Sequence, residues 1–422
     1  MADYFSTLRR FNRNIRLYIL AWGLIGFGFF GIQGVLFNLY LLRLGYDARF
    51  IGLFSSVGLL VWALCTLPAG AAGKMIGNRN AFIGGMLISM GANAMVLMVE
   101  AVPAHLRVAW LVAWWVMRWT GTALATVNGT PYLTGITDTG NRKHAFSSQQ
   151  AALAVSAFLG SLAAGFLPGL AAGSMGQTLD AAAPYRAVLW LTPLFYAAAI
   201  ALLLRTDAER TVERTVDSSA MGKKPVAFMV LMGVVVFLYM IGEGTVRTFF
   251  NIYMDSGLQV STAFIGTLMG VGQLLPIVAA MVAPVLMVKW GAGRTLTVSI
   301  VGLAASLLVL AVIPHWLGAS SAYIGVAAMA SIFGPARNVF SQEAVAPAWR
   351  TAISTATTMG VALGWAAAAW TGGSLLSILG YSGLFTLGAM LATMSAVLLQ
   401  SYLRRRSSEG LGPIDVSPAV EG

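Results

Sequence analysis

Long apolar runs separated by short polar segments cover most of the 422-residue sequence. A helix rises about 1.5 Å per residue, so each run can cross the roughly 30 Å of a bilayer's hydrocarbon core. The pattern predicts twelve membrane-spanning helices: 17–42, 50–73, 81–102, 106–134, 145–170, 185–204, 226–254, 262–288, 295–313, 321–342, 351–379 and 381–403. The first run is too long for a signal-peptide core and lacks an obvious cleavage site, so we interpret it as a retained helix.

Composition supports an all-α integral membrane protein. Hydrophobic residues make up 58% of the chain and charged residues 10%, whereas ordinary globular domains have about 45–50% and about 25%. Cys65 is the sole cysteine, which excludes a disulfide framework, and the 3 scattered histidines argue against a His-based metal centre. We therefore expect no metal and no cofactor.

Basic residues follow the pattern that orients a membrane chain. The formal net charge is +11, but the lysines and arginines lie in short tracts between apolar runs, which argues against a nucleic-acid-binding face. With twelve spans, most of these residues fall in the N-terminal arm, the C-terminal tail and one set of alternate loops. The other loops hold only Arg43, Arg49, Arg107 and Arg186. This asymmetry predicts that both termini are cytosolic.

Matching motifs in the two halves reveal an internal repeat. Phe37-Asn38-Leu39-Tyr40-Leu41 recurs as Phe250-Asn251-Ile252-Tyr253-Met254, displaced by 213 residues. Phe50-Ile51-Gly52 recurs as Phe264-Ile265-Gly266, displaced by 214, and Gly77 after Lys74 matches Gly291 after Lys289 at the same displacement. Three matches in this order predict two pseudo-symmetric six-helix bundles of equal orientation.

The repeat sets the predicted domain organisation. We expect an N-terminal bundle at 1–204, a cytosolic linker at 205–225, a C-terminal bundle at 226–403 and a disordered cytosolic tail at 404–422. The linker contains two copies of Glu-Arg-Thr-Val, beginning at Glu209 and Glu213, which place charges on one face of a short surface helix. The tail is rich in Ser, Gly and Pro.

The chain resembles the major facilitator superfamily over nearly its whole length. This family's loop between helices 2 and 3 reads Gly-x-x-x-Asp-Arg-x-Gly-Arg-Lys/Arg, and here Gly70, Gly77 and Arg79 fit that pattern. Lys74 stands at the usual acidic position and Met75 at the usual arginine. The resemblance implies a twelve-helix transporter fold and a set of gating-loop residues: Gly70, Lys74, Gly77, Arg79, Lys289 and Gly291.

Ionisable side chains inside the predicted spans are the first candidates for function, because each is costly in lipid. Four lie well inside: Arg118, Glu243, Arg247 and Arg337. Arg118-Trp119-Thr120-Gly121 also comes within one residue of the Arg-x-x-x-Gly found in helix 4 of proton-coupled family members. Their position inside the spans, together with this resemblance at Arg118, gives Glu243, Arg247 and Arg118 as the proton-coupling candidates.

A polar stripe distinguishes the seventh span from its counterpart in the first half. Tyr239, Glu243, Arg247 and Asn251 recur at steps of four along one helical face, where the first span has Gly26, Phe30, Gly34 and Asn38. In one interpretation Glu243 accepts a proton, and the nearby positive charge of Arg247 influences how readily Glu243 does so. In the other, the two residues only neutralise each other at i and i+4. For Arg118, the structural alternative is that it bonds to backbone carbonyls of neighbouring helices. For Arg337, the alternative is that its side chain extends to the inner lipid headgroups.

These residues define a predicted substrate cavity. Together, the four central ionisable groups carry a net charge that favours an anionic solute or an anionic substituent. Neutral polar and aromatic side chains at similar depth complete the set of cavity candidates: Gln33, Trp62, Arg118, Tyr239, Arg247, Gln273, Arg337, Asn338 and Trp365.

The sequence predicts transport and not catalysis. No Gly-x-x-x-x-Gly-Lys-Ser/Thr phosphate loop occurs. The segment Gly26-x-Gly28-x-x-Gly31 has the letters of a dinucleotide-binding fingerprint, but it lies inside an apolar helix and no strand precedes it, so we do not interpret it as a nucleotide site. We expect a monomeric secondary active transporter of the cell membrane that moves a small organic solute by alternating access, with proton-coupled efflux slightly favoured. An uncoupled or anion-specific facilitator or uptake carrier is the first alternative. A transporter-shaped receptor or scaffold that moves nothing is the second.

Overall fold

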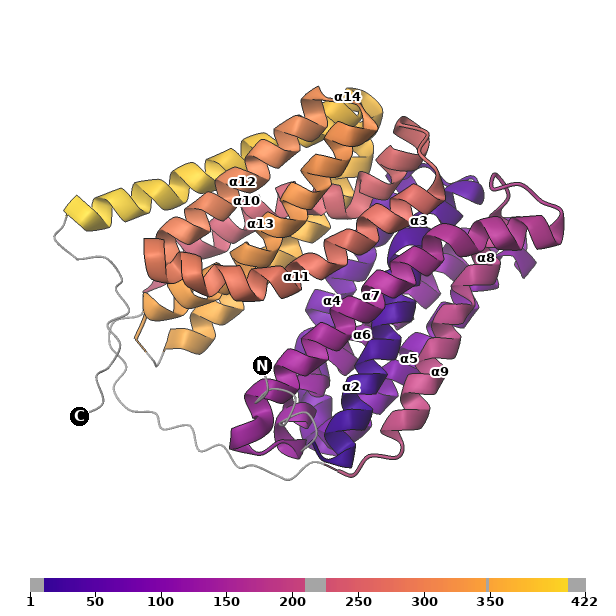
Figure 1. The fold of residues 1–422 in the computed structure, drawn as a ribbon, viewed down its shortest axis with the longest axis horizontal. Helices are drawn as coiled ribbons and strands as arrows, with labels where there is room; N and C mark the ends of the chain where they lie inside the picture. The colour runs from indigo at the N-terminus through magenta and orange to yellow at the C-terminus, as the bar shows by residue number, and fades with distance from the viewer. Residues whose placement is uncertain (1–10, 209–224, 347–348, 409–422) are drawn as a thin grey trace. The chain divides into compact units, whose positions relative to one another are not determined.

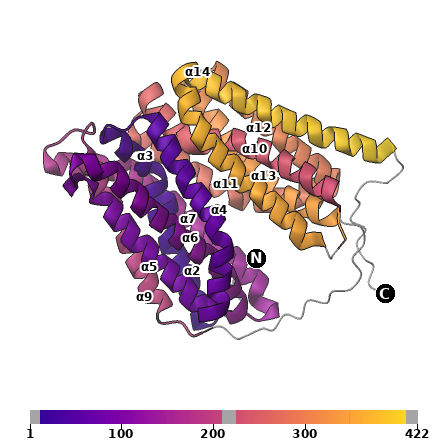
Figure 2. The same cartoon turned by 180° about the vertical axis from the view of Figure 1, so that it is seen from behind.

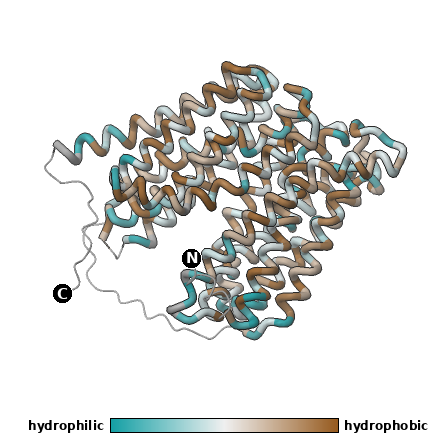
Figure 3. The backbone as a smooth tube through the Cα atoms, in the orientation of Figure 1, coloured by the Kyte–Doolittle hydropathy of each residue, from teal (hydrophilic) through white to brown (hydrophobic). Residues whose placement is uncertain are grey.

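The computed structural model describes residues 11–208, 225–346 and 349–408, and these residues form helices joined by short loops, with no strand among them (Figures 1 and 2). The helices of the first half are α2 (Arg13–Ile25), η1 (Gly26–Gln33), α3 (Gly34–Arg43), α4 (Ala48–Ile76), α5 (Asn78–Leu97), η2 (Val99–Ala101), η3 (Ala104–Leu106), α6 (Arg107–Ile136), α7 (Thr139–Met175), α8 (Ala182–Leu189) and α9 (Leu191–Leu203). Those of the second half are α10 (Val226–Ile252), η4 (Tyr253–Gly257), α11 (Thr262–Trp290), α12 (Ala292–Val312), α13 (Trp316–Glu343) and α14 (Arg350–Ser408). Hydrophobic residues predominate along these helices (Figure 3).

Twelve spanning helices emerge from these elements, as predicted. Ten helical stretches within the described residues are long and apolar enough to cross a membrane. One of them runs through Gly380, whose φ of 66° and ψ of −176° are not helical, so it comprises two helices joined at a sharp break. The 30-residue α6 is the remaining span, and it is less apolar because it carries Arg118, Asn128 and several threonines.

Local sequence signals explain where several helices begin. The side chains of Asn12 and Asp47 each accept a hydrogen bond from a backbone N–H of the following turn, at 2.9 Å from Ile15 and 2.8 Å from Phe50. Gly77 joins α4 to α5 with φ 85° and ψ 144°, and Gly291 joins α11 to α12 with φ 79° and ψ 157°. Positive φ favours glycine at both turns. The two halves therefore share this backbone conformation at matching positions of the repeat.

Contacts group the helices into two compact units, which we describe separately. Unit 1 comprises Met1–Arg214 with Asn251–Leu274, and unit 2 comprises Thr215–Phe250 with Leu275–Gly422. This grouping follows packing and not chain order, because it assigns the end of α10, η4 and the start of α11 to unit 1. The division into bundles at 1–204 and 226–403 follows the sequence repeat and remains a prediction.

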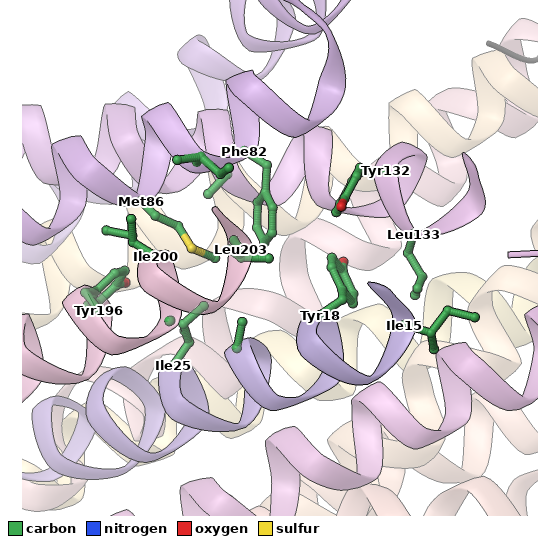
Figure 4. Packing of buried hydrophobic residues seen from close by; sticks show 14 of the residues in the cluster. Ile15, Tyr18, Ile25, Phe82, Met86, Tyr132, Leu133, Tyr196, Ile200 and Leu203 are labelled. Carbon is green, nitrogen blue, oxygen red and sulfur yellow. The ribbon is translucent and has the colours of Figure 1, made fainter. Parts of the chain in front are cut away.

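The core of unit 1 is partly aromatic toward one end of the helices (Figure 4). The Tyr18 ring lies 5.6 Å from that of Phe82 and 5.8 Å from that of Tyr132, measured between ring centroids. Tyr18 donates a hydrogen bond to the carbonyl of Gly129 at 2.8 Å, and Tyr132 donates to Thr206 at 2.6 Å. Both hydroxyl groups are therefore satisfied in the apolar interior.

Small residues allow close helix crossings in both units. In unit 1 a Cβ atom at Gly31 would lie 2.6 Å from the Cα of Gly160, and one at Gly160 would collide with the carbonyl of Phe27. The glycines of the Gly26-x-Gly28-x-x-Gly31 segment thus serve packing of the π-helical η1 against α7 and α9. Predicted small-residue pairs do the same: Gly266 and Gly270 face α7, and Gly360 and Gly364 face α10.

Two predicted segments fall mainly outside the described residues. Most of the linker 205–225, including its two Glu-Arg-Thr-Val copies, lies there. Helix α14 continues to Ser408, beyond the predicted end of the last span at 403, and the rest of the predicted tail is outside the described residues.

Candidate functional site

The predicted site residues divide between the two units. Unit 1 holds four of them: Gln33, Trp62, Arg118 and Gln273. Unit 2 holds the other six: Tyr239, Glu243, Arg247, Arg337, Asn338 and Trp365. Each set is described within its own unit.

A buried carboxylate forms the centre of the unit 2 set. Glu243 on α10 is 9% exposed, and the indole Nε1 of Trp365 on α14 donates a hydrogen bond to its Oε2. Arg247, one turn further along α10, places NH1 3.7 Å from Oε1 of Glu243. The Arg247 guanidinium lies 4.5 Å from the centroid of the Trp365 ring, so the three side chains contact one another in a closed triad.

Glu243 and Arg247 differ strongly in how far their side chains are exposed. The Arg247 side chain is 52% exposed, whereas that of Glu243 is 11% exposed. Their separation of 3.7 Å is too long for a hydrogen bond of good geometry. Trp365 therefore makes the direct bond to the carboxylate, and Arg247 acts on it as a nearby charge.

Tyr239 and Arg337 extend the unit 2 set along α10 and α13. Tyr239 is fully buried one turn before Glu243, and its ring stacks on that of Phe333 with centroids 3.6 Å apart. The Tyr239 hydroxyl is buried without a hydrogen-bond partner. Arg337 lies 6.0 Å from the Phe333 ring and donates from Nε and NH2 to Oδ1 of the exposed Asn338, at 3.3 and 3.0 Å.

Arg118 is the buried charged residue of the unit 1 set, and aromatic rings surround it. Its side chain is 1% exposed on α6, and its guanidinium lies between three aromatic rings, 4.4 Å from Phe29, 4.7 Å from Trp115 and 4.8 Å from Trp119. Its Nε and NH1 are buried without a hydrogen-bond partner. The backbone bonds proposed above as the structural alternative for these atoms are therefore not observed.

The other predicted residues of unit 1 differ in burial and in their polar contacts. Gln33 donates from Nε2 to Oδ1 of Asn93 on α5 at 2.9 Å, and both residues are nearly fully buried. Trp62 on α4 donates to Thr126 on α6 at 3.4 Å and is partly exposed. Gln273 on α11 is also partly exposed. The structure thus places Gln33 in a buried polar pair, and Trp62 and Gln273 nearer the surface of the unit.

The gating-loop residues of the first half pack the end of unit 1. Arg79 donates from NH2 to the carbonyls of Leu203 and Leu204 at 3.1 and 3.0 Å, and from Nε to Thr206 at 3.2 Å. It therefore caps the last carbonyls of α9. Gly70 faces Val127 at ordinary contact distance, while Lys74 is exposed.

Their counterparts in the second half are simpler. Lys289 is exposed at the end of α11, and Gly291 forms the turn into α12 described above. A gating role for the six loop residues remains a prediction in both halves.

Several contact residues were absent from the predicted set. Asn93, Trp115 and Trp119 in unit 1 and Phe333 in unit 2 contact predicted residues directly. Asn93 could have been found as a polar residue inside the predicted span 81–102. Trp115 and Trp119 are four residues apart, with Arg118 between them, but tryptophan is too common in membrane helices for that spacing to single them out.

A separate apolar groove occurs in unit 2 between α12 and α14. It is lined by Leu308, Ala389, Met390, Thr393, Met394 and Val397. None of the predicted site residues lines it, so it has no part in the polar sites.

Comparison with known proteins identifies the fold and the family. The sequence matches the model of the Major Facilitator Superfamily over residues 18–365. A search of curated proteins found no match.

Solved structures of similar fold cover almost the whole chain. A D-xylose–proton symporter is 14% identical, with a TM-score of 0.73 over 94% of this chain and 97% of that one. A bacterial homologue of the iron transporter ferroportin is 13% identical, with a TM-score of 0.73 over 92% and 98%. A bacterial homologue of the lysosomal transporter Spinster is 16% identical, with a TM-score of 0.69 over 96% and 98%. At these identities the likeness shows the fold alone, and the named cargoes differ too much to select a solute.

Proposed function

Because this chain belongs to the Major Facilitator Superfamily, we propose that it is a secondary active transporter that moves a small organic solute by alternating access and uses protons as the coupling ion. Membrane transport is the activity of the family. The coupling ion, the solute class and the slight preference for efflux are our proposal. We further propose that the chain acts as a monomer in the cell membrane with both termini cytosolic.

The observation that supports proton coupling best is the environment of Glu243. Among the described residues, it is the one acidic side chain placed away from the ends of the spanning helices. A carboxylate in this position is costly unless it is paired or used. Trp365 donates to one oxygen while Arg247 stands 3.7 Å from the other, so protonation can occur on the Arg247 side without breaking the indole bond. Arg247 can then turn toward its exposed surroundings.

The test begins with a thermal-shift screen of metabolites and drugs against the purified protein, and transport of each hit is then followed in proteoliposomes. Internal pH is recorded with a trapped dye while solute flux is measured under an imposed pH gradient. We expect solute movement to carry protons in the wild type. In Glu243→Gln, we expect gradient-driven accumulation to be lost while downhill movement of the solute persists.

A matched control is available in Glu343→Gln, which makes the same change at an exposed position at the end of α13. This variant should accumulate solute like the wild type. Full gradient-driven transport by Glu243→Gln would remove the coupling role from Glu243. Solute flux without any pH change would instead favour the uncoupled carrier.

Orientation is tested by labelling single cysteines in a Cys65→Ser background. We expect the exposed His105→Cys and His315→Cys to react with an impermeant maleimide added to intact cells, and the exposed Asn80→Cys to react only after the membrane is opened. The reverse pattern would place the termini outside.

A further inference from the structure

We propose that Arg118, Trp115 and Trp119 of α6 form a binding subsite for the carboxylate of a monoanionic organic solute. This inference rests on the proposed transport function and narrows its substrate class. It concerns unit 1 alone.

The buried Arg118 guanidinium carries a charge that no acidic side chain balances. Arg118 is 1% exposed, and within the part of the chain that the structure describes no acidic side chain forms an ion pair with it. A buried cation without a counter-charge is strongly unfavourable. The other Asp, Glu, Lys and Arg side chains of the described unit 1 residues lie in loops or toward the ends of the spanning helices.

Hydrogen-bond donors without acceptors surround this charge. Arg118 Nε and NH1, Trp115 Nε1 and Trp119 Nε1 are all buried without an acceptor. Buried polar groups are nearly always bonded, so four neighbouring donors without partners indicate a missing acceptor. A carboxylate supplies two oxygens and about four lone-pair directions, and it donates nothing in return.

The donors also converge. The Nε1 atoms of Trp115 and Trp119 both pack against Gly58 of α4, where a Cβ atom would collide with them, so the two indole N–H groups lie close together beside the α4 backbone. The Arg118 guanidinium lies 4.7 and 4.8 Å from the centroids of the same two rings. Any larger residue at position 58 would displace both indoles, so this glycine allows the arrangement.

A purely structural role for the Arg118 side chain finds little support in its contacts. Ser89 and Thr122 donate to the backbone carbonyl of Arg118, at 3.4 and 3.0 Å, and this fixes the main chain and not the guanidinium. The three ring faces stabilise the cation, but they offer no oxygen or nitrogen acceptor to its N–H groups.

The same features select the class of anion. One full positive charge balances one negative charge, which favours a carboxylate over a phosphate dianion. Phe29, 4.4 Å from the guanidinium, and the two indoles supply apolar surfaces for the organic body of the solute. A monoanion with an apolar or aromatic body therefore fits the subsite best.

The experiment measures ligand-induced thermal stabilisation and tryptophan fluorescence of the purified full-length protein. The probes are sodium acetate and sodium benzoate, compared at equal ionic strength with benzamide, inorganic phosphate and sodium chloride. We expect acetate and benzoate to stabilise the wild type, with benzoate the tighter of the two, and benzamide and chloride to have no effect. Arg118→Gln should weaken benzoate binding by at least about tenfold, since a charge-assisted hydrogen bond is lost.

Two further variants keep the test decisive. Trp119→Phe retains the ring but removes one donor, so it should fold like the wild type and bind benzoate several-fold more weakly. Arg107→Gln makes the same substitution as Arg118→Gln at the start of α6 and should leave benzoate binding unchanged. Absence of stabilisation by both carboxylates, a larger shift with phosphate, or unaltered benzoate binding in Trp119→Phe and Arg118→Gln would each overturn the inference.

Failure of this inference is separable from failure of the transport proposal. Binding of benzoate through Arg118 in a protein that moves no solute would uphold the subsite and refute transport. Proton-coupled flux that is unaffected by Arg118→Gln would uphold transport and refute the subsite.

Discussion

Asn38 donates from its Nδ2 to the Oδ1 of Asn251 at 3.4 Å, so the two asparagines that occupy the same position of the sequence repeat bond to each other. Asn251 in turn donates to the carbonyl of Val35 at 3.1 Å. Both contacts lie within unit 1 and hold the end of α10 against α3. The motif that revealed the repeat therefore has a packing role in the folded chain.

Asn251→Ala should destabilise the protein by about 1–3 kcal/mol, because it removes two hydrogen bonds made by a nearly fully buried side chain, the one to the Val35 carbonyl and the one from Asn38. Unfolding by sodium dodecyl sulfate in mixed micelles measures the effect. The exposed Asn80→Ala serves as control and should stay within about 0.5 kcal/mol of the wild type. Equal stability of the two variants would show that the Asn251 contacts contribute nothing.

Exchanging the charges of Arg43 and Asp255 together should restore much of the stability that either single charge reversal removes. Arg43 donates from NH1 and NH2 to the two oxygens of Asp255 at 2.9 and 2.8 Å, a bidentate geometry with both side chains partly buried. Arg43→Asp and Asp255→Arg should each lower the thermal transition of the purified protein. The double variant should recover much of the loss, and a strictly additive loss would argue against direct coupling.

Gly160→Ala should destabilise the protein by about 1–3 kcal/mol, since its Cβ atom would collide with the backbone of Phe27 at the crossing of η1 and α7. Gly169→Ala on the same helix is the control, because no atom lies within 4 Å of the added methyl group. It should be neutral or slightly stabilising. Thermal denaturation in detergent compares the two, and an equal response would contradict the packing role.

Trp365→Phe should reduce gradient-driven transport while the protein still folds. The change removes the indole donor to Glu243 but keeps an aromatic ring beside Arg247. Trp370→Phe makes the same change on α14 at a side chain that is 56% exposed, and it should transport like the wild type. Solute accumulation in proteoliposomes is the measurement, and undiminished accumulation by Trp365→Phe would show that the indole bond is dispensable.

The sequence predicted the helices well because apolar run length and turn glycines are local signals. The twelve runs match the helical elements, and the repeat anticipated the shared conformation of Gly77 and Gly291. The family match over residues 18–365 confirms the inferred transporter fold.

Side-chain partners were less predictable, because they depend on how helices distant in sequence rotate and cross. Spacing alone paired Glu243 with Arg247, but it could not show that Trp365, on another helix, makes the direct bond to the carboxylate. Likewise, residue type marked Arg118 as unusual without revealing that aromatic rings and not acids surround it. The residues that complete both sites came from such long-range packing.

The π-helical turn η4 explains why the two copies of the repeat differ in length. The displacement between copies is 213 residues at Asn251 and 214 at Phe264, so the later copy has gained one residue between these points, and η4 at Tyr253–Gly257 lies in that interval. A wide turn accommodates an additional residue without unwinding the helix on either side. The extra residue of the second copy is thus accommodated at a helix end, and Asp255, the partner of Arg43, lies inside this enlarged turn.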